Sequence, residues 1–468
     1  MAIANWKIRV QCWIMPESSL FVPMMVPCLS ETEEACMLFN VKDFGAIGDG
    51  VTDDTPAFQL VASTIDSLNG GVVYIPRGTY LLTDHFAFST GNLHIYGDGI
   101  GLSTILVGAW IDGIRVANGY PAAVAVVDDV LIENLSINGN RSNYTPGPSD
   151  THGNGINLNA VNRVTVRNCE VYDVAEQGIV STYWNATELC DHLVIDNNIV
   201  RDCQTSRISI GLEGRVRASR VTNNTVIGNR GIGIYVGHNT GSGENGEVIV
   251  GHNRVEGAAS EYAVGIYIED YVFDCLVTSN IVVNNNIGIR ASVNTGPTAR
   301  HQLNNNTILQ WTQFGIINFP LTGADRSFTQ IATNRIYTDV AEEGSVAIVA
   351  SAGTSVQANM IRATGPGNAI GIAAAGDGVR FISNDIDVEG YSLSDAGKAD
   401  VVALSNFITT DVNFASSSTQ ASANLGATPI RWTRANLGAV VSTLGLPTTA
   451  GVTGLVYHDT STNTLKVS

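Results

Sequence analysis

The middle of the chain repeats a short pattern in which an Asn precedes an Ile or Val by two residues. Looser copies lie upstream at Asn134 and Asn168. Each repeat also holds a Gly-Ile stretch such as "GIGIYV" or "VGIYIED", whose alternation predicts a short strand. No helix-length periodic segment separates these strands, so the pattern predicts a repetitive all-β fold. The eight regular copies stand at Asn198, Asn224, Asn253, Asn280, Asn306, Asn334, Asn359 and Asn384, and subtraction of neighbouring positions gives intervals of 26, 29, 27, 26, 28, 25 and 25 residues.

A unit of this length cannot bury its own apolar face, but stacked units can. Strands from successive turns then pair in parallel about 4.8 Å apart. This predicts a single-stranded parallel β-helix, in which distant residues become neighbours on one wall. The Asn at a fixed place in each turn predicts a left-handed backbone conformation and a ladder of side-chain amides between turns. A β-propeller is disfavoured, because its blades need roughly 40 or more residues.

The segment "TDDTPAFQLVASTIDSLNGG" predicts a helix before the first strands. An Asp or Thr can cap its beginning, Pro56 stands at an early helical position, and Gly70 and Gly71 follow its end. The open strand edge at the end of a β-helix invites aggregation unless it is covered. We therefore expect this helix to cover the first turn. Its expected apolar face consists of Phe58, Val61, Ile65 and Leu68.

The chain divides into three predicted parts: an N-terminal arm or leader over 1–38, a β-helix over 39–405, and a C-terminal linker and cap over 406–468. Residues 10–29 are apolar but broken by prolines and Glu17, so no membrane insertion is expected. The last part is rich in Ser, Thr and Ala and ends in "GLVYHDTSTNTLKV", which predicts a hairpin that either caps the β-helix or forms part of a trimerisation region.

Composition narrows the choice of partner. The formal charge of −18 argues against nucleic acid, which requires a basic face. An acidic polysaccharide is not excluded, but Arg or Lys would then have to line its site. The seven cysteines include no CxxC pair, so free buried thiols are expected. The histidines show no ligand spacing, and no nucleotide-binding or nucleophile motif occurs in a suitable context, so we expect no cofactor and no metal.

The stretch "FNVKDFGAIGDGVTDDTPAFQ…NGGVVYIPRGTY…IYGDG" resembles the N-terminal sequence of the pectate lyase superfamily of right-handed β-helix proteins. That superfamily includes pectin-active enzymes, alginate C-5 epimerases and bacteriophage tailspike depolymerases. The resemblance covers about residues 39–400 and implies a right-handed β-helix, which also agrees with general chain chirality. The chain end is similar to the ends of phage tail fibres and tailspikes, which implies a homotrimer in a virion tail or an extracellular setting.

The Gly-Ile strands predict where chemistry sits, because alternate side chains point outward and form a column up the stack. This column is polar and aromatic over residues 150–290 and bland above, at Ile317, Val349 and Ala373. The expected catalytic residues are Glu213, Glu269 and Asp270, and the expected substrate-binding residues are Tyr183, Arg207, Arg215, Tyr235, His238, Tyr267 and Arg290.

Glu213 and Glu269 stand two turns apart with Gly237 between them, so their backbones are expected on the order of 9–10 Å apart. Inverting glycosidases separate their two carboxyl groups by roughly 6.5–9.5 Å. One carboxyl would protonate the leaving oxygen and the other would activate water. The sequence does not distinguish these two roles, and each Glu could instead be an ordinary exposed acid. The tyrosines would offer apolar faces to sugar rings.

A second cluster suggests a lyase or C5-epimerase acting on a uronic acid polymer. An Arg would neutralise the carboxylate of the sugar while a His or Tyr removes the C5 proton. The resemblance weakens the epimerase interpretation: alginate C-5 epimerases carry an Asp-Pro-His-Glu motif that the corresponding strand "QGIVSTYW" lacks, although their next acid would match Glu213. The cluster consists of Asp150, His152, Glu176 and Arg207.

These patterns together predict a tailspike-like protein that binds a polysaccharide in a lateral groove and hydrolyses it. The alternatives are a lyase or C5-epimerase, and a non-catalytic adhesin or fibre that only binds glycan.

Overall fold

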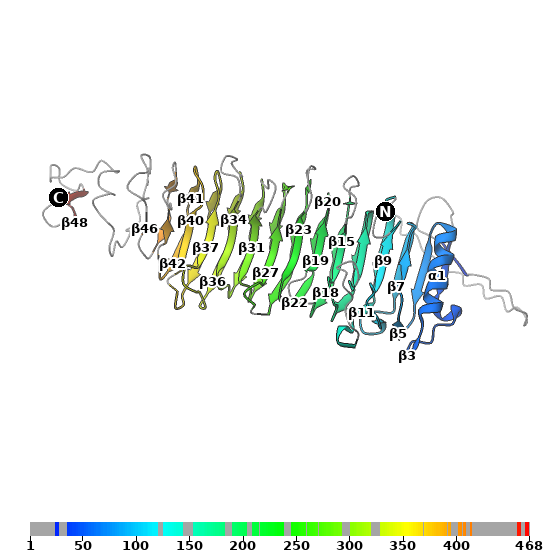
Figure 1. Cartoon of the computed structure of the whole chain (residues 1–468). Coiled ribbons are helices and arrows are strands. Elements are labelled where there is room, and N and C mark those ends of the chain that lie inside the picture. Colours follow the sequence, from blue (N-terminus) through cyan, green and yellow to red (C-terminus); the bar gives the residue numbers. More distant parts are fainter. Residues whose placement is uncertain are drawn as a thin grey trace, which may run out of the picture.

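The computed structural model describes residues 24–27, 35–119, 125–143, 153–182, 190–203, 208–214, 216–237, 245–258, 260–269, 271–292, 300–319, 328–367, 369–390, 392–394, 401–404, 406–408, 412–413, 456–459 and 464–467. Three long sheets run the length of one elongated stack (Figure 1). Their strands pair in parallel, apart from the antiparallel pair β1–β2 at one end. The fold is a right-handed parallel β-helix, which confirms the predicted fold class.

Each turn contributes one strand to each of the three sheets, named A, B and C here. Sheet A contains β1 (Met24–Pro27), β2 (Ala35–Asn40), β4 (Gly71–Ile75), β7 (Leu93–Gly97), β10 (Val127–Glu133), β13 (Val161–Arg167), β17 (Val194–Asp196), β21 (Arg220–Thr222), β25 (Ile249–Gly251), β29 (Leu276–Thr278), β32 (Gln302–Asn304), β35 (Gln330–Ala332), β38 (Ser355–Gln357), β41 (Arg380–Ile382) and β44 (Val402–Leu404). Sheet B contains β3 (Asp49–Asp53), β5 (Gly78–Leu82), β8 (Ser103–Val107), β11 (Ser136–Asn138), β14 (Glu170–Tyr172), β18 (Ile199–Arg201), β22 (Thr225–Asn229), β26 (Arg254–Gly257), β30 (Ile281–Val283), β33 (Thr307–Leu309), β36 (Arg335–Thr338), β39 (Met360–Ala363), β42 (Asp385–Val388) and β45 (Phe407–Ile408).

Sheet C contains β6 (Ala87–Phe88), β9 (Ile114–Ala117), β12 (Ile156–Asn159), β15 (Ile179–Thr182), β19 (Ile208–Glu213), β23 (Ile232–Gly237), β27 (Val264–Ile268), β31 (Ile287–Ser292), β34 (Phe314–Phe319), β37 (Val346–Ala350), β40 (Ile370–Ala374), β43 (Leu393–Ser394) and β46 (Val412–Asn413). The remaining elements are a small sheet of β16 (Cys190–Asp191), β20 (Val216–Arg217), β24 (Asn245–Gly246) and β28 (Val272–Phe273), the antiparallel pair β47 (Val456–Asp459) and β48 (Thr464–Val467), the helix α1 (Thr55–Leu68), and the 3₁₀ turns η1 (Val41–Phe44) and η2 (Arg141–Asn143). The domain boundaries proposed above stay predictions.

Inward-pointing side chains stack into continuous apolar columns. In sheet C the column is made of the Ile of each Gly-Ile strand, and all its members are fully buried. Because the register does not shift along this column, a residue in one turn lies directly above its counterpart. The members of the column are Ile156, Ile179, Ile210, Ile234, Ile266, Ile289, Ile316, Ile348 and Ile372.

The repeated Asn residues form the predicted ladder. Each donates its amide N–H to the side-chain oxygen of the Asn one turn further on, at 2.9–3.0 Å from Asn198 through to Asn406. The same amide also donates to a strand carbonyl, as Asn280 does to Val250 at 2.9 Å. Buried amides are therefore fully satisfied at the corner between sheets A and B.

The predicted left-handed conformation is wrong for the ladder Asn itself and belongs to the residue before it. Asn197, Asn223 and Asn305 have φ between 54° and 58°, each one position before a ladder Asn. The upstream copies Asn134 and Asn168 occupy this left-handed position, with φ of 59° and 53°. The ladder position next to Asn168 is taken by Cys169, whose backbone N–H donates to the Asn198 side chain at 3.0 Å.

Helix α1 covers the first turn of the stack, as expected (Figure 1). Phe58, Val61 and Ile65 are buried against it, whereas Leu68 is 47% exposed and does not belong to the apolar face. Asp54 stands at the N-cap, but its carboxylate accepts hydrogen bonds from Ile47 and Gly48 in the preceding loop instead of capping the helix. No helix in the described part of the chain is long and apolar enough to span a membrane.

The ladder predicts a measurable stability term. Asn280→Ala leaves the buried backbone and side-chain N–H groups of Asn253 without their acceptor, so we expect a loss of about 2–4 kcal/mol in the free energy of unfolding. Urea unfolding of the purified chain measures it. Gln302→Ala, at an exposed position on sheet A, is the control and should change stability by no more than about 0.5 kcal/mol. Equal midpoints for the two variants would contradict the role of the ladder.

Candidate functional site

The outward column predicted from the Gly-Ile strands exists on sheet C. Backbone pairing places Tyr235 beside Tyr267, and Tyr267 beside Arg290. The full column runs through Arg115, Asn157, Val180, Gly211, Tyr235, Tyr267, Arg290, Ile317, Val349 and Ala373. The change from polar to apolar above Arg290 therefore lies along one wall of the stack.

Glu269 is held by two tyrosines on this wall. It follows the last residue of β27 and is 7% exposed. The Tyr267 hydroxyl donates to its Oε1 at 2.8 Å, and the Tyr235 hydroxyl, from the turn before, donates to its Oε2. The two phenol rings meet edge to face with centroids 5.7 Å apart. The carboxylate is thus fixed in position by donors from two consecutive turns.

Gly237 makes this arrangement possible. A Cβ at this position would overlap the Tyr235 phenol and lie 3.0 Å from the Glu269 Cβ. Because the position has no side chain, the Tyr235 ring can reach across its own strand end to the Glu269 of the next turn.

Glu213 ends β19 on the same wall and pairs in register with Gly237. Its side chain is partly exposed. With Gly237 as the intervening turn, the backbones of Glu213 and the Glu269 position are separated by two strand spacings, or about 9–10 Å. Burial and the charge and hydrogen bond of Glu269 raise the pKa of Tyr235, and the negative charge of Glu213 adds to this effect.

The tyrosine rings point outward, but they are not open platforms for sugar. Tyr235 and Tyr267 are only 6% and 5% exposed. They pack into an outer apolar cluster, separate from the interior core, and the Arg290 guanidinium lies 4.5 Å from the centre of the Tyr267 ring. Their observed role is to hold Glu269. The outer cluster is completed by Val264, Ile287, Ile208, Ile232, Phe314 and Ile317.

The other predicted residues are only partly placed. Glu176 is buried at 5% exposure beside Gly153, and its backbone N–H donates to the Gly153 carbonyl at 3.0 Å. Of the expected lyase cluster, the described part of the chain contains only Glu176, so the structure does not test whether the four residues lie together. Among the described residues, no group of three or more His, Cys, Asp or Glu could hold a metal ion. The predicted residues that lie outside the described part of the chain are Tyr183, Arg207, Arg215, His238, Asp270, Asp150 and His152.

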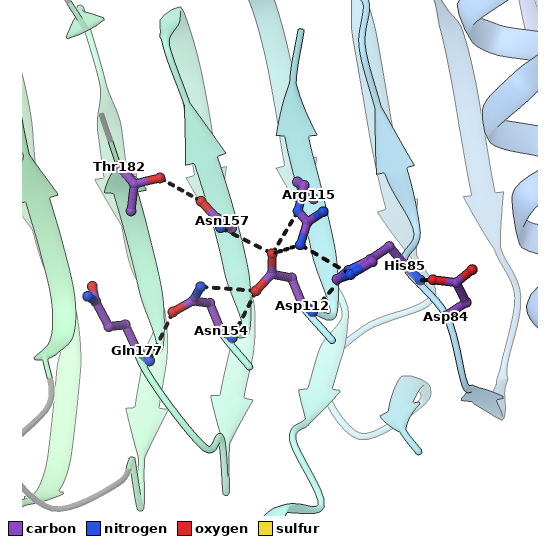
Figure 2. Close-up of polar contacts among 8 residues, drawn as sticks. All are labelled: Asp84, His85, Asp112, Arg115, Asn154, Asn157, Gln177 and Thr182. Carbon is purple, nitrogen blue, oxygen red and sulfur yellow. Dashed lines mark hydrogen bonds and ion pairs between the residues drawn. The ribbon is translucent and has the colours of Figure 1, made fainter. Parts of the chain in front are cut away.

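A buried polar network that the sequence did not reveal lies on the same wall, toward the end of the stack that α1 covers (Figure 2). Asp112, with no exposed surface, is its centre. One carboxylate oxygen accepts from the backbone and side chain of Asn154, both at 3.0 Å. The other accepts from Arg115 at 2.7–2.8 Å and from Asn157 at 3.1 Å. His85 contacts the network from the turn below, 3.2 Å from Arg115.

This network locks neighbouring turns together. Asn157 extends it to Thr182 on β15 at 2.9 Å, and Asn154 extends it to the backbone of Gln177 at 3.1 Å (Figure 2). Both oxygens of Asp112 are engaged, so the carboxylate serves as a buried counter-ion and hydrogen-bond acceptor. Only Asn157 could have been found from the sequence pattern, because it stands in the outward column. Asp112 and His85 lie in loops with no periodic pattern.

Residues 38–258 match the family model described as rhamnogalacturonase A/epimerase, pectate lyase-like. Over this range, which is a little under half of the chain, the sequence is similar to pectate lyase-like proteins. The resemblance inferred from the N-terminal motif is therefore confirmed.

The chain is similar to polysaccharide-modifying enzymes of Azotobacter vinelandii. Mannuronan C5-epimerase AlgE1 is 28% identical over 241 residues, which are 43% of this chain and 16% of that protein. Alginate lyase 7 is 37% identical over 168 residues, or 31% of this chain and 18% of that protein. The chain therefore spans less than a fifth of the length of either relative.

The fold is shared with a phage protein. The N-terminal fragment of gene product 12 of bacteriophage Phi29 superimposes with a TM-score of 0.62 at 14% identity, covering 82% of this chain and 72% of that one. At this identity the likeness concerns the β-helix fold alone.

The tyrosine pair predicts a dependence of stability on pH. Burial, and then the charge of Glu269, hold the pKa of both Tyr235 and Tyr267 above the usual value of 10.0. The unfolded chain releases these protons near pH 10 and the folded chain does not. The stabilisation is therefore complete below about pH 10 and is lost as the pH rises above it, by about 1.4 kcal/mol per pH unit and per tyrosine.

We expect Tyr235→Phe and Tyr267→Phe each to flatten this alkaline decline by one tyrosine's share, measured by urea unfolding across the alkaline range. Tyr337→Phe, at an exposed tyrosine on sheet B, is the control and should leave the slope as it is. Identical slopes for all three variants would contradict the burial of the two phenols as protonated donors.

The Asp112 network also gives a direct test. Asp112→Ala leaves the 7%-exposed Arg115 without its counter-ion, and breaking a buried pair in this way costs about 3–5 kcal/mol. A lowered thermal midpoint would report it. Asp43→Ala, at an exposed position in η1, should melt with the parent protein, and an Asp112→Ala variant that did the same would show that the network contributes nothing.

Proposed function

We propose that the outer face of sheet C binds a polysaccharide and that Glu213 and Glu269 hydrolyse its glycosidic bond. The observation that carries this proposal is the clasped carboxylate of Glu269, two turns from Glu213 on one wall with only a glycine between them. The backbone spacing of about 9–10 Å allows the two carboxyl groups to approach the separation of an inverting pair.

We infer different roles for the two acids from their different settings. Glu213, the more exposed acid, donates a proton to the leaving glycosidic oxygen. Glu269, fixed by two phenol donors, accepts a proton from the water that attacks the anomeric carbon. The bond from the anomeric carbon to the leaving oxygen breaks as the bond to water forms, so one reducing end appears for each cleavage. In this proposal, Arg290 and the partly exposed members of the outer cluster lie beside the bound polysaccharide.

The test is the release of reducing ends from a panel of bacterial capsular and plant polysaccharides. We expect Glu213→Gln and Glu269→Gln each to lower the rate about 10²–10⁴-fold, because each removes one proton transfer. Glu247→Gln, at an exposed acid before β25, is the matched control and should retain the parental rate. Reducing ends released at the parental rate by both site variants would rule out the hydrolase.

A second candidate is a lyase or C5-epimerase on a uronic acid polymer. It is favoured by the similarity to an alginate lyase and to mannuronan C5-epimerases. In the same assay, a lyase reveals itself by the ultraviolet absorbance of an unsaturated uronate at the new end. An epimerase inverts C5 without cutting the chain, which NMR of the polymer detects. Binding without any turnover would assign a non-catalytic adhesin or fibre.

A tailspike-like depolymerase in a virion tail or an extracellular setting belongs to this proposal and rests on the resemblance of the N-terminal motif and the chain end to tailspikes. A homotrimer belongs to the same proposal and rests on the similarity of the chain end to tailspike ends, where β47 and β48 form a hairpin.

A further inference from the structure

A cleft of about 750 Å³ opens at the corner where the chain passes from sheet B into sheet C. Its walls come from four consecutive turns, each contributing residues that stand between a strand of sheet B and the next strand of sheet C. This volume is in the range of ligand-binding clefts. The lining residues are Ser260, Glu261, Tyr262, Asn284, Asn285, Asn286, Gln310, Thr312, Gln313, Val340 and Glu342.

The polar part of the lining is a linked set of amides and a hydroxyl. Asn286 donates to the Glu261 carbonyl at 2.6 Å and lies 3.4 Å from the Gln313 side-chain oxygen. Thr312 donates to the Asn286 side-chain oxygen at 2.7 Å. These contacts hold Asn286 in place, while the amide of the exposed Gln313 keeps donor and acceptor capacity for a ligand.

Tyr262 supplies an apolar face beside these amides. Its side chain is 64% exposed, in contrast to the covered rings of Tyr235 and Tyr267. An exposed aromatic face flanked by amide donors and acceptors matches a sugar ring, which presents C–H groups on one face and hydroxyls around its edge.

The charge of the lining selects among sugars. Glu261 and Glu342 are both exposed at the cleft, and none of the residues that line it is Lys, Arg or His. A uronate or sulfated sugar would meet like charge and no cation to neutralise it. The lining therefore favours sugars that carry hydroxyl or acetamido groups and no charge.

The cleft is separate from the two acids but lies on the same face of the stack. Tyr262 shortly precedes β27, and Glu269 follows it, so the length of β27, about 16 Å, lies between them. Val264 and Ile287 of the outer cluster lie between Tyr262 and Glu269. A polysaccharide chain lying along β27 can therefore contact both the cleft and Glu269.

We propose that this cleft is a second, non-catalytic binding site for an uncharged oligosaccharide segment, held by stacking on Tyr262 and by hydrogen bonds to Gln313 and its neighbours. The site requires no chemistry at Glu213 or Glu269. It would retain the polymer next to the outer face of sheet C and would make the protein selective for glycans with neutral stretches.

The test is calorimetric titration of the full chain carrying both Glu213→Gln and Glu269→Gln, so that no ligand is cleaved. The probes are cellohexaose, maltohexaose and N-acetylchitohexaose, with hexamers of mannuronate and galacturonate as the charged set. We expect at least one uncharged hexamer to bind, and Tyr262→Ala to weaken its binding roughly tenfold, or about 1.4 kcal/mol, because the variant loses the aromatic face on which the sugar stacks. Gln313→Ala should weaken the same ligand.

Tyr337→Ala, at an exposed tyrosine on sheet B, is the matched control and should leave the dissociation constant unchanged. Unchanged thermal midpoints for the Tyr262 and Gln313 variants establish that they fold. The proposal is overturned if no uncharged hexamer binds, if Tyr262→Ala binds as tightly as the parent, or if uronate hexamers bind through Tyr262 equally well. Each of these results is independent of whether Glu213 and Glu269 cleave a bond, which the reducing-end assay decides separately.

Discussion

The structure depends on register between successive turns. Parallel strands tolerate a one-residue slip only by moving every side chain to the opposite face. The Asn ladder acts against such a slip at the corner between sheets A and B, in the turns from Asn198 to Asn406. Each ladder amide accepts two hydrogen bonds from the Asn before it and donates one to the Asn after it, while a strand carbonyl takes its remaining N–H. A displaced turn would bury these groups without partners. The apolar Ile column of sheet C then follows the same register.

The wall of sheet C shows what constant register makes possible. Arg115 near the helix-capped end and Arg290 well along the stack belong to one column, although 175 positions separate them in sequence (290 − 115). Along this wall, polar groups gather at two levels. At the lower level the groups neutralise one another around Asp112. At the upper level, the buried carboxylate of Glu269 is oriented by neutral phenols, and the partly exposed Glu213 lies two turns before it.

The sequence predicted the features that repeat and missed those that do not. The intervals of the Asn series predicted the ladder, and the alternation within each Gly-Ile strand predicted the outward column that contains Tyr235 and Tyr267, with Glu269 at the next outward position. The left-handed residue was displaced by one position, because Asn is common both at that place and at the ladder position, as the pair Asn197 and Asn198 illustrates. Burial of the tyrosine rings could not be predicted, since it depends on outer apolar neighbours contributed by several turns. Asp112 lies in a loop, where the sequence has no periodic pattern that could predict which residues contact it.

One small feature has a wide reach. Gly237 has no side chain, and the Tyr235 ring occupies the space that one would fill. The position of the Glu269 carboxylate therefore depends on the absence of a side chain at Gly237, in the turn before it. In a solenoid, where each coil could otherwise diverge on its own, this ties two adjacent coils into a single unit of inheritance: Tyr235 and Gly237 in one coil and Glu269 in the next can be exchanged together but not separately. Duplication or deletion of coils elsewhere would change the length of the β-helix, whereas a break between these two coils would separate Tyr235 and Gly237 from Glu269.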